Sequence, residues 1–286
     1  MSEANGMIRK KHQKISKPGK RSSAQKTQNA HASGKRPPAK AVSGHWLYGL
    51  HAVQEALSNS QRKIERLLAT PEAAQRLADK GLSQDQLRAI ESADRSAIDD
   101  LIGADKVHQG LALKTHPLPD LDIQDSLVGL AATEPALIIA LDHVTDPHNV
   151  GAILRSASAF GARAVLTTKH NAPEETGVLA KSASGAVEHV PIVRVTNLGR
   201  SLKECQDLGF WVVGLDASGS EEIDQMELPT RCVLVLGAEG EGLRPGVATS
   251  CDYMARLPMS GQMESLNVSN AAAISMYEWQ RRRRVK

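Results

Sequence analysis

The hydrophobic pattern separates an N-terminal stretch without periodicity from a longer part in which short apolar runs alternate with helical patterns. Within residues 134–286, the aliphatic runs are typical of buried strands, and the segments between them carry apolar residues at helical spacing. Strands are expected at 136–141, 164–168, 190–193, 211–215, 233–236 and 253–257. Helices are expected at 150–160, 176–182, 197–208 and 267–284. This alternation predicts an α/β fold with a largely parallel sheet covered on both faces.

A smaller alternating pattern occupies residues 45–115. Its predicted elements are an ordered start at 46–49, helices over 51–57, 71–77, 83–90 and 97–102, and strands at 64–69 and 110–113. Ser83 followed by Gln86 is a capping-box signal for the third of these helices. The elements predict a small α/β domain of about 70 residues, a length that folds alone. Residues 116–133, with two prolines and scattered acids, are the predicted linker to the larger domain.

Residues 1–44 form a basic N-terminal arm with 11 Lys and Arg residues and one acidic residue, Glu3. The whole chain has 35 basic and 32 acidic residues, so the remainder has 24 and 31 and a charge of −7. Because the arm has almost nothing apolar to bury, we predict that it is disordered. Such arms bind nucleic-acid phosphates through counterion release, and a solubilising tail is an equally good interpretation.

Composition restricts the class of protein further. The 286 residues are 41% hydrophobic without an apolar run of bilayer length, so no membrane span is expected. Cys205, Cys232 and Cys251 lack CxxC spacing, which favours reduced thiols in a cytoplasmic protein and argues against a zinc site. The N-terminus has no apolar signal core, so secretion is not expected.

The most informative stretch is 231–270, where two predicted strands each end in a loop. One strand stops at Gly-Ala-Glu-Gly-Glu-Gly, residues 237–242, and the other ends at Leu257. In parallel α/β sheets, ligands bind where strands end, and glycines let the backbone approach them. The spacing matches neither a P-loop nor a dinucleotide-binding fingerprint. The glycines alone are compatible with a ligand cradle or with a flexible acidic loop.

Polar residues stand at the starts of two predicted helices. Residues 265–270 place four small polar side chains before the last helix, where a cap needs one. Asn149 is placed to cap the helix at 150–160, and Arg155 falls off the apolar stripe of that helix. An arginine in the first turns opposes the helix dipole, so we expect a phosphate-like ligand or a salt bridge to a nearby acid.

The last helix and His108 have separate implications. The helix begins apolar on nearly every side, which predicts one face buried against the sheet and another against a partner subunit. His108 comes just before the strand expected at 110–113. We expect a hydrogen-bonded loop histidine there, with substrate contact as the alternative.

Three segments together resemble the signature motifs of the SpoU family of RNA ribose 2′-O-methyltransferases, in order and spacing: DPHNVGAILRSASAFGA, LVLGAEGEGL and LPMSGQMESLNVSNAAA. YGLHAVQEAL and VHQGLALK also resemble the small L30e-like RNA-binding domain of one subgroup of that family. The resemblance covers residues 46–284. It implies a trefoil-knotted SPOUT methyltransferase domain at 134–286, although chains rarely knot. It also implies a homodimer formed through the knotted domain.

The resemblance implies S-adenosylmethionine as the cofactor, with no metal. The loops of the knot bind this cofactor in the family, largely through backbone groups. The matching positions in this chain are Gly237, Leu257 and Leu266, with atoms of Leu215 and Ala238 beside them.

The resemblance also implies a set of catalytic residues. Arg155 is the residue nearest the reacting hydroxyl proton, and four others hold the substrate or neighbouring side chains: Asn149, Glu239, Ser265 and Asn267. A guanidinium titrates above about 12 and is a poor base. We therefore expect Arg155 to act while bound to a phosphate, lowering the pKa of the hydroxyl.

The activity implied by the resemblance is methylation of a ribose 2′-hydroxyl, of a guanosine in 23S ribosomal RNA, either free or in a pre-ribosomal particle. Transfer RNA is the alternative substrate. A non-catalytic RNA-binding or ribosome-assembly protein is the alternative class. A class I methyltransferase is disfavoured because the glycine loop comes late in the chain. With 3% aromatic residues, we expect RNA recognition through shape and phosphates more than base stacking.

Overall fold

The computed structural model describes residues 44–170, 172–261 and 265–284. The described residues all belong to one compact unit. The prediction of a disordered basic arm falls on residues that, apart from Gly44, lie outside the described part. None of the helices in the described ranges has the length and hydropathy needed to cross a bilayer.

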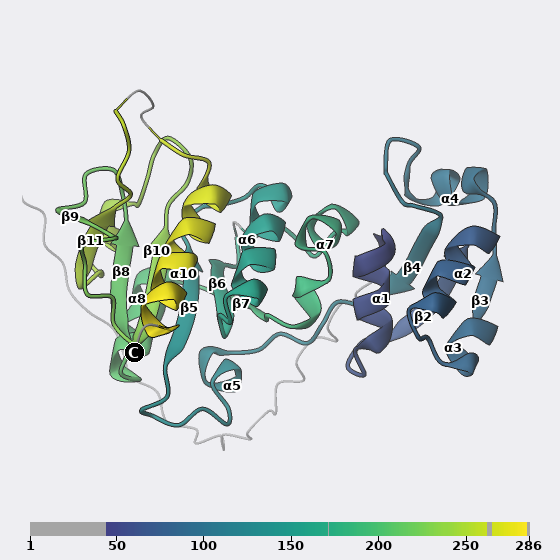
Figure 1. The fold of residues 1–286 in the computed structure, drawn as a ribbon, viewed down its shortest axis with the longest axis horizontal. Coiled ribbons are helices and arrows are strands. Elements are labelled where there is room, and N and C mark those ends of the chain that lie inside the picture. The colour runs from purple at the N-terminus through teal and green to yellow at the C-terminus, as the bar shows by residue number, and fades with distance from the viewer. Residues whose placement is uncertain (1–43, 171, 262–264, 285–286) are drawn as a thin grey trace, which may run out of the picture. The chain divides into compact units, whose positions relative to one another are not determined.

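A mixed four-stranded sheet is built from residues of the predicted small domain (Figure 1). Its strands are β1 (His45–Tyr48), β2 (Ile64–Ala69), β3 (Ile90–Ser92) and β4 (Leu111–Thr115), in the order β1-β4-β2-β3. β4 runs antiparallel to β1 and β2, whereas β3 is parallel to β2. The helices beside this sheet are α1 (Leu50–Ser58), α2 (Pro71–Asp79), α3 (Gln84–Arg88) and α4 (Arg95–Ile102).

Local capping signals account for two of these helix starts. Thr70 caps α2, and Ser83 with Gln86 forms the reciprocal capping box of α3 that the sequence predicts. The prediction that this helix continues to Ile90 is wrong. Ile90 begins β3 and pairs with Leu67 of β2, so sheet pairing overrides the helical pattern at this position.

The larger sheet has seven parallel strands in the order β7-β6-β5-β10-β8-β11-β9. They are β5 (Ala136–Leu141), β6 (Ala164–Thr168), β7 (Ile192–Val195), β8 (Trp211–Leu215), β9 (Glu221–Glu222), β10 (Arg231–Leu236) and β11 (Tyr253–Arg256). The six predicted strands are all present, although β7 starts two residues later than expected. Because the strands are parallel, the loops at their carboxyl ends meet along one edge.

Helices cover both faces of this sheet, as the alternating pattern predicts. One core cluster contains residues of α6 (Pro147–Ala159), α7 (Gly177–Ala183), the 3₁₀-helix η1 (Ala186–Glu188) and α10 (Val268–Arg284). The other contains residues of α5 (Ile123–Ser126), α8 (Leu198–Asp207) and α9 (Pro245–Ala248). α10 lies beside α6 in Figure 1. α5 lies within the predicted linker, and α9 lies in a stretch for which no helix was predicted. Each has four residues, which is too short to show helical periodicity in the sequence.

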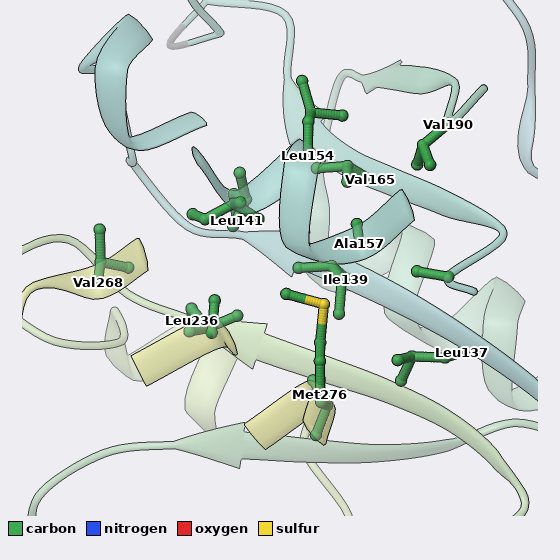
Figure 2. Packing of buried hydrophobic residues seen from close by; sticks show 14 of the residues in the cluster. Leu137, Ile139, Leu141, Leu154, Ala157, Val165, Val190, Leu236, Val268 and Met276 are labelled. Atoms are coloured by element: carbon green, nitrogen blue, oxygen red, sulfur yellow. The ribbon is translucent and has the colours of Figure 1, made fainter. Parts of the chain in front are cut away.

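Strand β5 divides its side chains between the two cores, since successive residues of a strand face opposite ways. Leu137, Ile139 and Leu141 join the cluster of α6 and α10, whereas Ile138 joins the cluster of α8. Figure 2 shows the side chain of Met276, from α10, extending toward Ile139. The sheet is therefore a fully covered support for the loops at its carboxyl edge.

Helix α10 buries one face only within this chain. Ala272, Met276 and Trp279 are buried, whereas Ile274 and Tyr277 are 46% and 51% exposed. The predicted burial of one face is confirmed. The predicted contact of the other face with a partner subunit stays a prediction.

A buried ionic cluster is centred on Arg62, in the turn between α1 and β2. The side chain of Arg62 is fully buried, and those of Glu175 and Glu188 are 7% and 3% exposed. The guanidinium Nε and Nη2 donate to Glu188 at 2.8–3.0 Å, and Nη2 also pairs with Glu175. Nη1 donates to the carbonyl oxygen of His116 at 3.0 Å. This cluster fastens the α1–β2 turn to the segments around α7 and η1.

Candidate functional site

A cavity of about 630 Å³ lies at the carboxyl ends of β8, β10 and β11. Its walls come from three chain segments: the end of β8, the glycine loop after β10, and the stretch from the end of β11 into α10. The described lining residues include all five positions predicted to contact a cofactor, namely Leu215, Gly237, Ala238, Leu257 and Leu266. The structure thus brings these positions together at one edge of the sheet.

The glycine loop is a compact turn. A Cβ on Gly237 would lie 2.1 Å from the backbone carbonyl carbon of Gly242, so the loop closes in this way only with glycine at position 237. Gly242 has a φ of 67°, a conformation that glycine adopts without strain. Its N–H donates to the carbonyl oxygen of Ala238 at 3.0 Å. The loop is therefore held by its own backbone, which fixes the wall of the cavity.

The lining of the cavity is acidic. Its described residues include four carboxylates and one guanidinium, those of Asp216, Glu222, Glu239, Glu241 and Arg256. Arg256 pairs with Glu222 at 3.0 Å, which offsets one of the negative charges. Hydrogen bonds from the hydroxyl and backbone N–H of Ser218 lower the pKa of Asp216, so this carboxylate is charged at neutral pH. The remaining negative charge favours a cationic ligand.

Three of the predicted catalytic residues form one hydrogen-bond network. Glu239 Oε1 accepts from Asn267 Nδ2 at 2.7 Å and from Asn149 Nδ2 at 3.1 Å. Asn267 Nδ2 also donates to Asn149 Oδ1 at 3.0 Å. The backbone N–H of Val268 lies 3.5 Å from the same carboxylate oxygen, at the start of α10. The network ties the glycine loop to the first turns of α6 and α10.

The prediction that Asn149 caps α6 is wrong. Asp146 is the capping residue, and the helix begins at Pro147. Asn149 therefore lies inside the first turn, where its side chain is available to Glu239 and Asn267. Asp-Pro is itself a strong helix-start signal, and it outweighs the asparagine three positions later.

The other two predicted catalytic residues lie apart from this network. Arg155 is exposed on α6 and forms no ion pair or hydrogen bond with the residues that the structure describes, so the expected salt bridge to a nearby acid is not seen there. Ser265 lines the cavity next to Leu266. Among the described residues, neither Arg155 nor Asn149 lines the cavity.

Sequence reasoning missed the pair formed by Asp142 and Arg244. Asp142 is fully buried and accepts hydrogen bonds from the backbone N–H of Arg244 at 2.9 Å and from its Nε at 2.8 Å. The pair joins the loop after β5 to the end of the glycine loop. The available signal was an acidic residue directly after an apolar strand, since a buried carboxylate requires a partner.

His108 is a hydrogen-bonded loop histidine, as expected. It is 3% exposed, its Nδ1 accepts from the N–H of Gly110 at 3.1 Å, and its Nε2 lies 3.1 Å from Asp99. Within the described ranges, no group of three or more His, Cys, Asp or Glu side chains is arranged to hold a metal ion.

The parallel sheet and its loop-built cavity place the protein in the class of SpoU methyltransferase folds. The SpoU methyltransferase AviRb from Streptomyces viridochromogenes superimposes with a TM-score of 0.70 at 23% identity, over 85% of this chain and 91% of that one. The AdoMet-bound rRNA methyltransferase from Sinorhizobium meliloti gives a TM-score of 0.68 at 23% identity, over 84% and 88%. At such identities the similarity establishes the fold.

Sequence comparison establishes the family. Residues 136–277 match the model of the SpoU rRNA Methylase family, and residues 46–121 match that of RNA 2′-O ribose methyltransferase substrate binding. The 23S rRNA (guanosine-2′-O-)-methyltransferase RlmB of Pseudomonas putida is 38% identical over 84% of this chain and 97% of its own. RlmB of Vibrio cholerae is 37% identical over 85% and 98%. The chain belongs to the SpoU rRNA methylase family, which confirms the predicted resemblance.

Proposed function

We propose that this chain transfers the methyl group of S-adenosylmethionine to the 2′-hydroxyl of a guanosine in 23S ribosomal RNA. Relatives named for that activity match it over nearly their whole length. The structural observation that carries the proposal is the acidic cavity of about 630 Å³ bordered by the Asn149–Glu239–Asn267 network. These relatives favour ribosomal over transfer RNA, and the intact network favours an enzyme over a non-catalytic assembly protein.

The lining residues fit the cofactor. S-adenosylmethionine supplies a methyl group on a positively charged sulfur, which makes the carbon electrophilic without a metal. The surplus of carboxylates offsets that charge. Gly240 and Gly261 line the cavity at positions where an added Cβ would meet nothing within 4 Å, so the space stays open. We assign the cofactor contacts to Leu215, Gly237, Ala238, Leu257 and Leu266.

Glu239 acts as an orienting acceptor. It accepts from the amides of Asn149 and Asn267, which fixes the rotation of both side chains and points their Nδ2 atoms at the carboxylate. Asn267 Oδ1 in turn accepts from the N–H of Ser269 at 2.9 Å. We propose that Asn149, Asn267 and Ser265 position the ribose, and that Glu239 holds the asparagines in place.

Arg155 is proposed to bind a phosphate of the substrate RNA. Its exposure, and its lack of an ion pair within the described residues, leave the guanidinium free for a bidentate phosphate contact. The guanidinium held beside that phosphate stabilises the charge that develops on the nearby 2′-oxygen and so lowers the pKa of the hydroxyl, whose proton leaves to bulk water at or after methyl transfer. Under single-turnover conditions, Arg155→Lys is expected to slow methylation strongly. Near-full turnover of that variant would show that a point charge suffices.

We also propose the arrangement of the assembly. The small domain at 45–115 is L30e-like and binds RNA, the linker at 116–133 joins it to the methyltransferase domain at 134–286, and this domain carries the trefoil knot. Two copies pair through the methyltransferase domain, supported by the exposed Ile274 and Tyr277 on α10. We propose a cytoplasmic location, where 23S rRNA or a pre-ribosomal particle is the partner.

The test combines binding with mapping. Titration calorimetry is expected to detect S-adenosylmethionine binding, and the purified chain is expected to methylate unmodified 23S rRNA at a guanosine ribose. Transfer RNA serves as the competing substrate in the same assay. A chain that binds the cofactor and methylates only transfer RNA would overturn the substrate assignment. A chain that binds RNA without binding the cofactor would overturn the enzymatic one.

A further inference from the structure

A second cavity, of about 460 Å³, lies at the carboxyl ends of β5, β6 and β7. Because β5 and β10 are neighbours in one parallel sheet, this cavity lies at the same edge as the acidic cavity but beyond β5. Its described lining includes His143, Thr168, His170, Asn197, Gly199 and Arg244. The proposed function uses none of these residues.

Helix α8 begins at this second cavity. Its first backbone hydrogen bond runs from the N–H of Ser201 to the carbonyl oxygen of Asn197, and the Asn197 side chain caps the N–H of Arg200 at 2.9 Å. The N–H groups of Leu198 and Gly199 precede that bond and have no acceptor among the described residues. α8 has ten residues, so its N-terminus offers free donors and a partial positive charge to an anion.

Thr168 supplies an independent observation. It is the last residue of β6, it is 8% exposed, and it lines the cavity. Its Oγ1 is buried without a hydrogen-bond partner in the described part of the chain. Buried hydroxyls are normally paired, so an unpaired one in a cavity wall points to a ligand that completes the pairing.

The charges around the second cavity are compatible with an anion. Asp142, beneath it, is neutralised by Arg244, whose Nη2 lies 2.6 Å from Oδ1. The Arg244 side chain is 44% exposed, and its Nη1 makes no hydrogen bond with a described residue. No acidic residue is among the described lining, and the rings of His143 and His170 offer hydrogen-bond donors to an anion.

We propose that this second cavity binds a backbone phosphate of the substrate RNA, next to the nucleotide that is methylated. The proposal rests on the proposed function. His143 lies in the loop that leads to Asn149, and Arg244 lies in the segment that follows Glu239. Arg244 thus borders the second cavity two residues beyond the glycine loop that lines the first. An RNA strand whose ribose reaches Asn149 and Glu239 brings a neighbouring phosphate toward this side of the glycine loop.

The test uses Thr168→Val, which removes the hydroxyl and keeps the shape, with Thr167→Val as the matched control. Thr167 precedes Thr168 on β6, faces the other side of the sheet, and does not line the cavity. His170→Gln is a second variant at an exposed position, where folding is not at risk. Initial rates are measured on unmodified 23S rRNA at saturating S-adenosylmethionine, with inorganic phosphate as a competitor.

Thr168→Val is expected to raise the KM for RNA about tenfold with little change in kcat, since one hydrogen bond to a charged group is lost. His170→Gln is expected to raise KM in the same direction, and Thr167→Val to leave it unchanged. Phosphate is expected to compete with RNA for the wild type and less effectively for Thr168→Val.

Three results would separate the possibilities. An unchanged KM for both Thr168→Val and His170→Gln overturns the phosphate subsite. Weaker phosphate inhibition with an unchanged KM shows a site for free phosphate and also overturns the assignment to RNA. If the wild type binds S-adenosylmethionine but methylates neither 23S rRNA nor transfer RNA, the proposed function fails. That outcome is distinct from the two that overturn the phosphate subsite.

Discussion

Replacing Arg62 by methionine removes the guanidinium at the centre of a buried cluster and keeps most of the side-chain volume. Burial acts to lower the pKa of Arg62, but hydrogen bonding to Glu188 and the charge of Glu175 outweigh it and raise that pKa. Burial likewise acts to raise the pKa of Glu175, but His45 and Arg62 outweigh it and lower that pKa. Arg62→Met therefore leaves two buried carboxylates without their shared cation, with His45 still beside Glu175 and the amide of Asn59 still donating to Glu188.

The expected loss in the free energy of unfolding at pH 7 is about 3–5 kcal/mol, the usual result of removing one partner of a buried ion pair. For a unit of this size, that loss corresponds to a fall in Tm of about 6–20 °C. The control is Arg66→Met. Arg66 pairs with Glu91, but the two side chains are 45% and 46% exposed, so solvent screens the pair and little stability is expected to be lost.

Urea unfolding followed by circular dichroism measures both variants. Because the pKa of Glu175 is lowered on folding, its contribution is present above the usual value of 4.5 and is lost as the pH falls through the folded pKa. Without Arg62, Glu175 takes up a proton at higher pH, which relieves the unpaired charge. The difference in the free energy of unfolding between wild type and Arg62→Met is therefore expected to narrow on acidification. Equal urea midpoints for Arg62→Met and Arg66→Met, or a difference from wild type that does not change with pH, would refute this account.

Three further outcomes are expected. Gly237→Ala forces a Cβ against the backbone of Gly242, so the Kd for S-adenosylmethionine is expected to rise more than about tenfold by calorimetry; an unchanged Kd would exclude that loop from the site. Glu239→Gln keeps an acceptor but loses its charge, so kcat/KM is expected to fall about five- to tenfold and Glu239→Ala to fall further; equal rates would contradict the orienting role. Burial raises the pKa of Cys205 and Cys251 to about 12, so both thiols are expected to resist iodoacetamide at pH 8, and rapid labelling of the native chain in mass spectra would contradict this.

The strands of the larger sheet were readable from the sequence because each is a continuous apolar run that ends at a polar or glycine-rich loop. β5, β6 and β8 begin and end at the expected residues. The order of the strands was not readable, since periodicity says nothing of the placement of β10 between β5 and β8. The knot and the L30e-like character of the smaller domain stay predictions, as do the domain boundaries.

The site was predictable only in part. The five cofactor positions and the catalytic set came from the resemblance of three motifs, and the structure gathers the cofactor positions around one cavity. The pair of Asp142 and Arg244 was not visible, because its partners are far apart in the chain and neither lies in a repeating pattern. The capping position predicted for Asn149 was wrong for a related reason: its hydrogen-bond partners, Glu239 and Asn267, lie on other segments.

The central position of β10 has a consequence for synthesis on the ribosome. β5 precedes β10 by four strands in the chain, yet β10 is one of its two neighbours in the sheet and emerges from the exit tunnel only after β6, β7, β8 and β9. A nascent chain that stops before residue 231 keeps an unfilled gap between β5 and β8. Such long-range pairing slows folding. Fragments that end before residue 231 are thus expected to be targets for chaperones and proteases, never partially active enzymes.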